Sequence, residues 1–283
     1  MSRNSKRTTI APPSPQLKPV TQTSIPNPFG IDLVAATEVV KLPSGGRFYE
    51  EGSTLHGVSE VEIKHMTARE EDILANPKFI ENGSIFDKLL ESILVDKQIN
   101  PAHFLPADRT AVMYAARITG YGNEYILNMP CQACGKQTNF KFDISKQEIV
   151  NDTPDGVTIN ETSGTFMFSL PKTGLTVEVR LLTTEDEDFI AKQSEKAESL
   201  GIPVNKTVNL FSRAVVSVNG ISDQGALTQL FENLPAIDSR KLRSVINNIS
   251  PRLSTKQTIA CDLCGTESES EVPFTLGFFW PDV

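Results

Sequence analysis

Four cysteines are the residues of this chain best suited to chemistry. They fall in two Cys-x-x-Cys-Gly segments, Cys131–Gly135 and Cys261–Gly265, and the chain holds no other cysteine. A spacing of two residues lets both thiols of a pair point into one site, and the glycine that follows permits the left-handed backbone of a metal knuckle. The pattern predicts thiolate ligation of a metal ion.

Strand-like sequence flanks both cysteine pairs, which predicts two hairpins with a knuckle at each tip. The flanking segments are 125–129 and 140–144 around the first pair and 257–259 and 272–276 around the second. Two such hairpins make a zinc ribbon, in which four thiolates close a tetrahedral, structural site. We therefore expect one Zn²⁺ per chain, and the predicted ligands are Cys131, Cys134, Cys261 and Cys264.

Two other uses of the thiols are less consistent with the sequence. A redox protein of the thioredoxin type would carry one Cys-x-x-Cys at the start of a helix, whereas both pairs here lie between strands. A catalytic zinc needs an open coordination position, which four protein thiolates remove. His56, His65 and His103 form no metalloprotease motif, and the chain lacks phosphate-loop, dinucleotide and nucleophile-elbow motifs. We predict no catalytic residues and no small-molecule substrate.

An internal repeat accounts for the 126 residues that separate the two cysteine pairs. Residues 61–74 align without a gap to residues 177–190, and 23 residues separate Asp108 from Cys131 and Asp238 from Cys261 alike. A weaker match joins two loops upstream, Leu42-Pro-Ser-Gly45 and Leu170-Pro-Lys-Thr-Gly174. We interpret this agreement as a duplication in which each copy ends in half of the ribbon.

Each copy is predicted to contain a strand followed by helices. The strands carry Val61 and Val177, and the helices after them open on capping-box sequences at 67–70 and 184–187. Acids in these first turns fit the helix dipole. Further helical patterns cover 85–94, 108–117, 208–216 and 239–249.

The predicted fold is α+β, with two duplicated strand-helix repeats joined by a discontinuous four-cysteine zinc ribbon built from one hairpin of each repeat. The predicted domains are a basic, proline-rich arm at 1–28, a first repeat with its knuckle at 29–150, and a second repeat with its knuckle and an aromatic C-terminus at 151–283.

The two ends of the chain differ from its body, the first in charge and the last in aromatic content. The 283-residue chain has a net charge of −8, but the arm carries Arg3, Lys6, Arg7 and Lys18 and no acid. Its prolines block helices and strand ladders, so it is either a solvated arm or a peptide that orders against a partner. At the other end, Phe278, Phe279 and Trp280 either close the chain's own core or bind a partner.

The composition also predicts where the protein is located and whether it binds nucleic acids. No apolar stretch is long enough to span a bilayer and no signal-peptide core is present, so we expect a soluble, intracellular protein without membrane contacts. Near the knuckles, Lys136 and Lys141 are offset by Glu267, Glu269 and Glu271. This is a poor surface for phosphates, which disfavours the alternative of a nucleic-acid-binding zinc ribbon.

Several motifs together resemble the baseplate hub protein family of large contractile-tailed bacteriophages of the T-even type. They are Leu42–Tyr49, Met66–Leu74, Leu89–Val95, Ala116–Gly122, Cys131–Gly135 and Phe278–Pro281. The resemblance is strongest over residues 38–145. It implies a non-enzymatic structural or assembly protein that binds other baseplate or hub subunits, in the host cytoplasm during assembly and in the tail baseplate of the virion. It leaves open whether the chain stays in the finished baseplate.

Overall fold

A computed structural model describes residues 35–274 and 276–279 of the chain. Helices alternate with small antiparallel sheets, which confirms the α+β class. The arm at 1–28 and Trp280 lie outside the described residues.

The first half begins with a strand pair followed by helices. In β2 the alternation of buried Val61 and Ile63 with exposed neighbours places one face of the β1–β2 pair on the core. Thr67 and Glu70 then form the predicted capping box that starts α1. The elements are β1 (Thr37–Lys41), β2 (Glu60–Lys64), α1 (Ala68–Leu74), α2 (Pro77–Glu81), α3 (Ile85–Ile93), η1 (Pro101–His103), α4 (Pro106–Tyr121), β3 (Glu124–Pro130), β4 (Gln137–Asp143) and β5 (Glu148–Val150).

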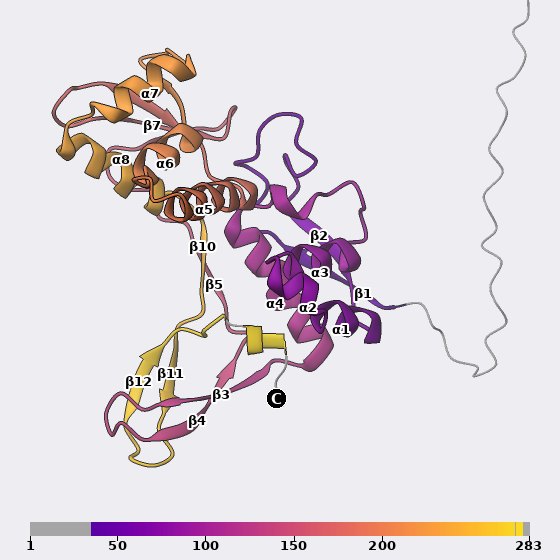
Figure 1. The fold of residues 1–283 in the computed structure, drawn as a ribbon. Coiled ribbons are helices and arrows are strands. Elements are labelled where there is room, and N and C mark those ends of the chain that lie inside the picture. The colour runs from indigo at the N-terminus through magenta and orange to yellow at the C-terminus, as the bar shows by residue number, and fades with distance from the viewer. Residues whose placement is uncertain (1–34, 275, 280–283) are drawn as a thin grey trace, which may run out of the picture. The chain divides into compact units, whose positions relative to one another are not determined.

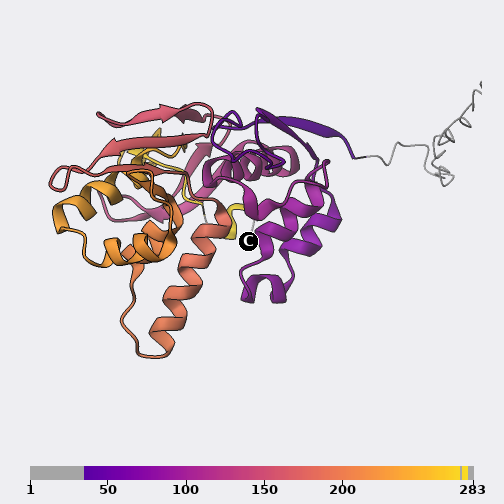
Figure 2. The ribbon, with the colours of Figure 1, turned by 90° about the horizontal axis from the view of Figure 1, so that it is seen from above.

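The second half follows a similar order around a four-stranded sheet, β6-β7-β8-β9. Figure 2 shows α5 and the turn after it projecting beyond the neighbouring helices. The elements are β6 (Thr158–Asn160), β7 (Thr165–Ser169), β8 (Thr176–Val179), α5 (Thr184–Ser199), α6 (Lys206–Ala214), β9 (Val215–Val218), α7 (Gln224–Glu232), α8 (Ala236–Asn248), β10 (Arg252–Ser254), β11 (Gln257–Ala260), β12 (Glu267–Ser270) and η2 (Leu276–Phe279).

Two predictions for the second half are wrong in detail. Its capping box uses Thr183 and Asp186, one residue earlier than predicted, so it matches Thr67 and Glu70 at the repeat offset of 116. The helical pattern over 208–216 ends at Ala214, where the chain continues as strand β9. The three β-branched valines of Val215–Val218 favour a strand, and pairing with β8 stabilises it.

The two cysteine hairpins, β3–β4 and β11–β12, lie together at the foot of Figure 1, and the two-stranded sheet β5–β10 leads from them toward the helices. The strand predicted at 272–276 is wrong, because β11 pairs with 267–270 instead. The short knuckle turn fixes this register, so that Gln257, the first residue of β11, already pairs with Ser270. None of the described residues beyond 270 belongs to a strand, and Pro273 has no N–H to donate to one.

The core is continuous across both halves and both hairpins. The helical spacing predicted over 85–94 is confirmed, since Ile85, Leu89, Leu90 and Ile93 of α3 are buried. Helix α4 packs against β1, β10 and η2. Elements from the two ends of the chain are thus held on one central helix.

Candidate metal centre

The two cysteine knuckles have the same backbone geometry. The N–H of Cys131 donates to the carbonyl of Lys136 at 2.9 Å, and the N–H of Gly135 donates back to the carbonyl of Cys131 at 2.8 Å. In the second hairpin, Cys261 and Gly265 repeat this pattern at 3.0 and 2.8 Å, with Thr266 in place of Lys136. Both glycines have positive φ, at 68° and 71°. The conformation that the sequence required of these glycines is therefore present.

All four thiols lie close together in one cluster. The Sγ atoms of Cys131, Cys134, Cys261 and Cys264 lie within 4.8 Å of one another. The Sγ atoms of Cys131 and Cys264, which come from different hairpins, are 3.8 Å apart. Ligands at the usual zinc–sulfur distance in a tetrahedron would be separated by about 3.8 Å. The described residues thus fit a tetrahedral metal ion shared by the two hairpins.

Burial and local hydrogen bonds distinguish the four thiols. Cys131 and Cys261 are buried, with 6% and 1% of their surface exposed, whereas Cys264 is exposed. Backbone N–H groups of Cys134 and Ala133 hold the pKa of Cys131 below its ordinary value. The hydroxyl and backbone of Thr266 lower the pKa of Cys264 to about 6, and burial raises the pKa of Cys261 to about 11. The site combines thiolate character with a partly dry interior, as a ligand set for a soft metal requires.

Contacts away from the sulfurs hold the hairpins in place. The side-chain amide of Gln257 donates to the carbonyl of Asp143 at 2.8 Å, and its oxygen accepts from the N–H of Asp143 at 2.9 Å. This pair of bonds joins the start of β11 to the end of β4, and the two strands pack together. Neither Gln257 nor Thr266 was predicted. Gln257 bonds to the other hairpin, and Thr266 bonds locally to Cys264, but neither position belongs to the Cys-x-x-Cys-Gly pattern.

Similar hydrogen bonds occur at corresponding positions of the two halves. Asp108 and Asp238 are both the third residue of their helices, α4 and α8, and both are fully buried. Asp108 accepts from the backbone and side chain of Ser44, at 2.8 and 2.6 Å. Asp238 accepts from the backbone N–H groups of Lys172 and Thr173, at 2.8 and 3.0 Å. The weakly matched Leu-Pro loops therefore occupy equivalent places beside equivalent helices.

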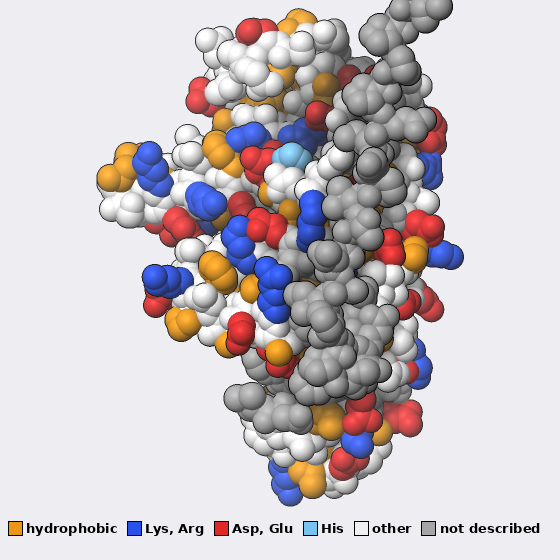
Figure 3. Space-filling model, turned by 90° about the vertical axis from the view of Figure 1, so that its right-hand side faces the viewer, with side chains coloured by type: hydrophobic (Ala, Val, Ile, Leu, Met, Phe, Trp, Pro, Cys, Tyr) orange, Lys and Arg blue, Asp and Glu red, His pale blue; other side chains and the backbone are white. Residues whose placement is uncertain are grey.

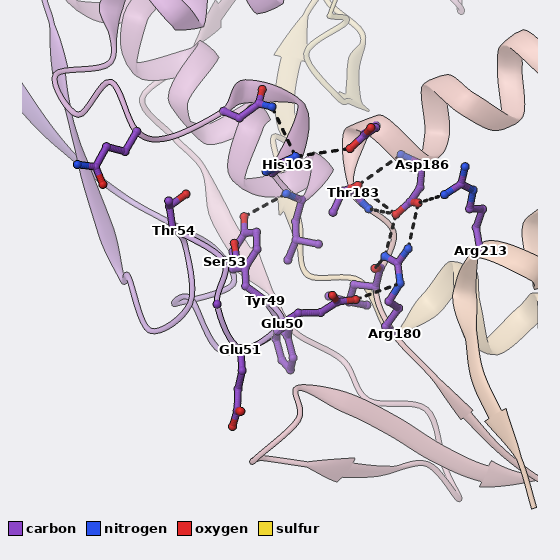
Figure 4. A pocket seen from close by; sticks show the side chains of 17 residues that line it. Tyr49, Glu50, Glu51, Ser53, Thr54, His103, Arg180, Thr183, Asp186 and Arg213 are labelled. Carbon is purple, nitrogen blue, oxygen red and sulfur yellow. Dashed lines mark hydrogen bonds and ion pairs between the residues drawn. The ribbon is translucent and has the colours of Figure 1, made fainter. Parts of the chain in front are cut away.

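A polar cavity of about 570 Å³ lies where the halves meet (Figure 4). Arg180 donates to Asp186 through both terminal nitrogens, at 2.8 and 3.0 Å, and its Nε lies 3.5 Å from Glu50 of the first half. Arg213 lies 3.7 Å from Asp186 and stacks on the Phe189 ring. The arginines of this cavity are thus paired with its carboxylates, and they consolidate the junction between the halves.

The structure places the two described residues of the aromatic end in the interior. Phe278 and Phe279 are fully buried, and Phe278 packs against the rings of Tyr114 and Tyr125 at 4.8 and 5.3 Å. The guanidinium of buried Arg117 donates to the carbonyl of Phe278 at 2.8 Å. Of the two uses considered for these side chains, their burial favours closure of the chain's own core.

Comparison with known proteins identifies one family. The family described as T4 bacteriophage base plate protein matches residues 34–280. No curated protein and no solved structure matches the chain. In the part of the chain that the structure describes, no helix combines the length and apolar character that a membrane span requires.

Proposed function

The chain belongs to the T4 bacteriophage base plate protein family, and from this premise we propose that it is a non-enzymatic structural or assembly component of the hub region of a contractile phage tail baseplate. Its role is to bind other baseplate subunits, during assembly in the host cytoplasm and in the virion tail. The four-thiol cluster supports the proposal that the protein is not an enzyme, because its geometry suits a structural metal ion rather than a catalytic one.

The proposed metal is zinc, one ion per chain, held by Cys131, Cys134, Cys261 and Cys264. Four thiolates leave no position for water or substrate, so the ion would supply folding free energy and no chemistry. Because the two cysteine pairs lie 126 residues apart in sequence, the ion would tie distant parts of the chain together.

The proposed architecture is a duplication, with repeats at 29–150 and 151–283. Its support is the set of equivalences at matched positions: the capping boxes of α1 and α5, the buried aspartates of α4 and α8, and the knuckle geometry. Strands β5 and β10 follow and precede the cysteine hairpins, and they pair with each other across the proposed boundary. The two repeats would thus share a sheet rather than form separate consecutive domains.

Partner binding is proposed at the ends and on the surface of the chain. Because Phe278 and Phe279 are buried, Trp280 is the residue of the aromatic motif that we propose to contact a partner. The basic arm at 1–28 is the second proposed contact. On the face shown in Figure 3, basic and acidic side chains are interspersed. Among the described side chains visible on that face, basic residues form no continuous strip that would support the nucleic-acid alternative.

Co-purification from infected cells tests this function. The phage would encode a tagged chain, and the proteins bound to it would be identified by mass spectrometry and compared with the composition of mature particles. An untagged infection is the control. We expect other baseplate subunits to co-purify. Presence in mature particles would identify a permanent component, and restriction to intermediates would identify an assembly factor. Absence of every baseplate subunit, or salt-sensitive retention of nucleic acid instead, would contradict the proposal.

A further inference from the structure

An apolar groove of about 420 Å³ runs along one edge of strand β1. Four consecutive residues of this strand, Glu38 to Lys41, line the groove. Successive side chains of a strand point to opposite faces of the sheet, so four consecutive residues can line one groove only along the edge of the strand. The groove therefore exposes the backbone of β1 as well as its side chains.

The hydrogen-bond register shows which backbone groups face the groove. Residues 36 and 42 bond to the strand opposite them, since His65 donates to the carbonyl of Ala36 and Leu42 donates to the carbonyl of Ser59. In an antiparallel ladder such bonded positions alternate, so the even-numbered residues of β1 face β2. The backbone groups of Thr37, Val39 and Lys41 point the other way.

This outward edge of β1 is open within the described residues. No described residue forms a hydrogen bond with the backbone groups of Thr37, Val39 or Lys41. The far edge of β2, in contrast, is covered, because Val95 donates to the carbonyl of Glu62 at 3.0 Å and Leu94 forms a bridge with Ile63. Among the described residues, only the β2 edge of this sheet therefore has a backbone partner.

The other surfaces of the groove suit an extended chain. Its floor is one face of helix α4, where Ala111 and Ala115 leave room above the helix. Its opposite wall contains Ile149 of strand β5, together with Ser145 and Gln147 from the turn and loop that precede this strand. Val39 and Ile149 flank the groove with 55% and 49% of their surfaces exposed.

We propose that this groove binds an extended strand of another baseplate subunit, which adds to the free edge of β1. The row of outward backbone groups at every second residue is matched by another extended backbone, which is the basis of strand addition. An uncovered edge with an exposed valine is otherwise an aggregation hazard. That the occupant comes from a baseplate subunit rests on the proposed function.

The groove also defines the chemistry of its occupant. Its lining includes one acid, Glu38, and one base, Lys41, and the other lining residues are apolar or neutral. The bound segment should therefore be apolar or neutral in its centre and contain a proline-free stretch of β-branched residues. An acidic residue near Lys41 and a basic residue near Glu38 would complement the two ends.

Synthetic peptides test the proposal directly. Overlapping 15-residue peptides would cover every baseplate protein of the same phage and this chain itself, and fluorescence polarisation would measure their binding to the purified full chain. Val39→Pro removes an outward N–H that the β1–β2 ladder does not use, and Val39→Thr is its control because it keeps that N–H. Ala115→Phe fills the floor, with Ala226→Phe on an exposed position of α7 as control.

We expect at least one peptide from another baseplate subunit to bind the wild type and both controls. Val39→Pro and Ala115→Phe should each weaken this binding by about tenfold or more. Hydrogen exchange should show protection of Val39 and Lys41 only with bound peptide. Thermal melts would verify folding, and if Val39→Pro fails to fold, Ala115→Phe carries the test.

Three results would overturn the groove as the docking site: equal binding by all variants, binding of this chain's own peptides alone, or no peptide binding. Intact baseplate subunits, tested in parallel, separate this failure from failure of the proposed function. If they bind the wild type and Val39→Pro equally, the groove is not the docking site, but the proposed function is still supported. If no intact subunit binds, both proposals fail.

Discussion

The two buried aspartates at the starts of α4 and α8 occupy equivalent positions but have different partners. Asp108 accepts from the hydroxyls of Ser44 and Tyr49, both at 2.6 Å, as well as from one backbone N–H. Asp238 accepts from two backbone N–H groups, one on each oxygen. A hydroxyl can donate or accept, whereas a backbone N–H can only donate. The two carboxylates should therefore respond differently to the same substitution.

We predict that Asp238→Asn lowers the free energy of unfolding more than Asp108→Asn does. The amide nitrogen introduced at 238 must face a backbone donor whichever way the side chain is turned, while at 108 it can face the two hydroxyls. The cost at 108 should be about 1 kcal/mol. Urea unfolding of both variants checks the order. A larger loss for Asp108→Asn would contradict the hydrogen-bond assignment.

The same pair predicts opposite pH dependences. Burial raises the pKa of Asp108 above its ordinary 3.8, so the wild type should lose stability relative to Asp108→Asn as pH rises from that value through the raised one. Burial also favours a higher pKa at Asp238, but the hydrogen bonds from Lys172 and Thr173 outweigh it, so the pKa of Asp238 is lowered. Relative to Asp238→Asn, the wild type should keep its higher free energy of unfolding above pH 3.8. It should lose this difference as the pH falls through the lowered pKa of Asp238. Unfolding measured between about pH 3 and 7 checks both signs.

Some residues could be predicted from the sequence and others could not. The cysteines and the two aspartates stand at matched spacings, so the pattern alone predicts a shared thiol site and pairs the two aspartates. Tyr49 reaches Asp108 across 59 positions, and Gln257 reaches Asp143 across 114. Such contacts depend on how the elements pack, and no local periodicity records them.

At the scale of elements, buried Arg117 joins three segments through their carbonyls. Its Nε donates to Phe278 of η2, and its terminal nitrogens donate to Gly122, which follows α4, and to Glu124, which begins β3. A lysine ammonium cannot reproduce this planar set of bonds, so buried carbonyls would lose their donors. The guanidinium therefore fixes the closing turn of the chain onto its central helix.

We predict that Arg117→Lys lowers the free energy of unfolding by about 2 to 3 kcal/mol. Arg243→Lys, at an exposed position of α8, is the matched control and should change stability by less than about 0.5 kcal/mol. Chemical denaturation measures both. Equal stability of the two variants would show that the Arg117 bonds to η2 and β3 contribute little.

The type of most elements followed from local sequence, but several boundaries did not. Capping boxes and helical spacing indicated α1, α3, α4 and α8, while pairing with β8 fixed Val215–Val218 as a strand. The edge of β12 shows the same limit, because knuckle register selected the polar run Glu267–Ser270 over the more apolar 272–276. Tertiary pairing overrides local preference where the two compete.

At the scale of the whole molecule, we predict that the arm serves assembly and not folding. Residues 1–28 have few apolar side chains to offset the entropy of ordering, so the isolated protein should be cleaved there first by protease. Deleting 1–28 should leave folding and zinc content intact while reducing incorporation into baseplates. Trp280→Ala should impair assembly, stability or both. Normal incorporation and infectivity of the arm-deleted phage would show that the arm is a solvated tail.

One metal ion is proposed to join the two halves of the chain, and metal analysis of the purified protein under reducing conditions would detect it. The cluster of four thiols within 4.8 Å predicts one zinc per chain. Cys131→Ser and Cys261→Ser should each abolish stoichiometric zinc and lower the melting temperature similarly, since each breaks the same tetrahedron. Two ions per chain, no metal, or retention of full zinc by either variant would contradict a shared site.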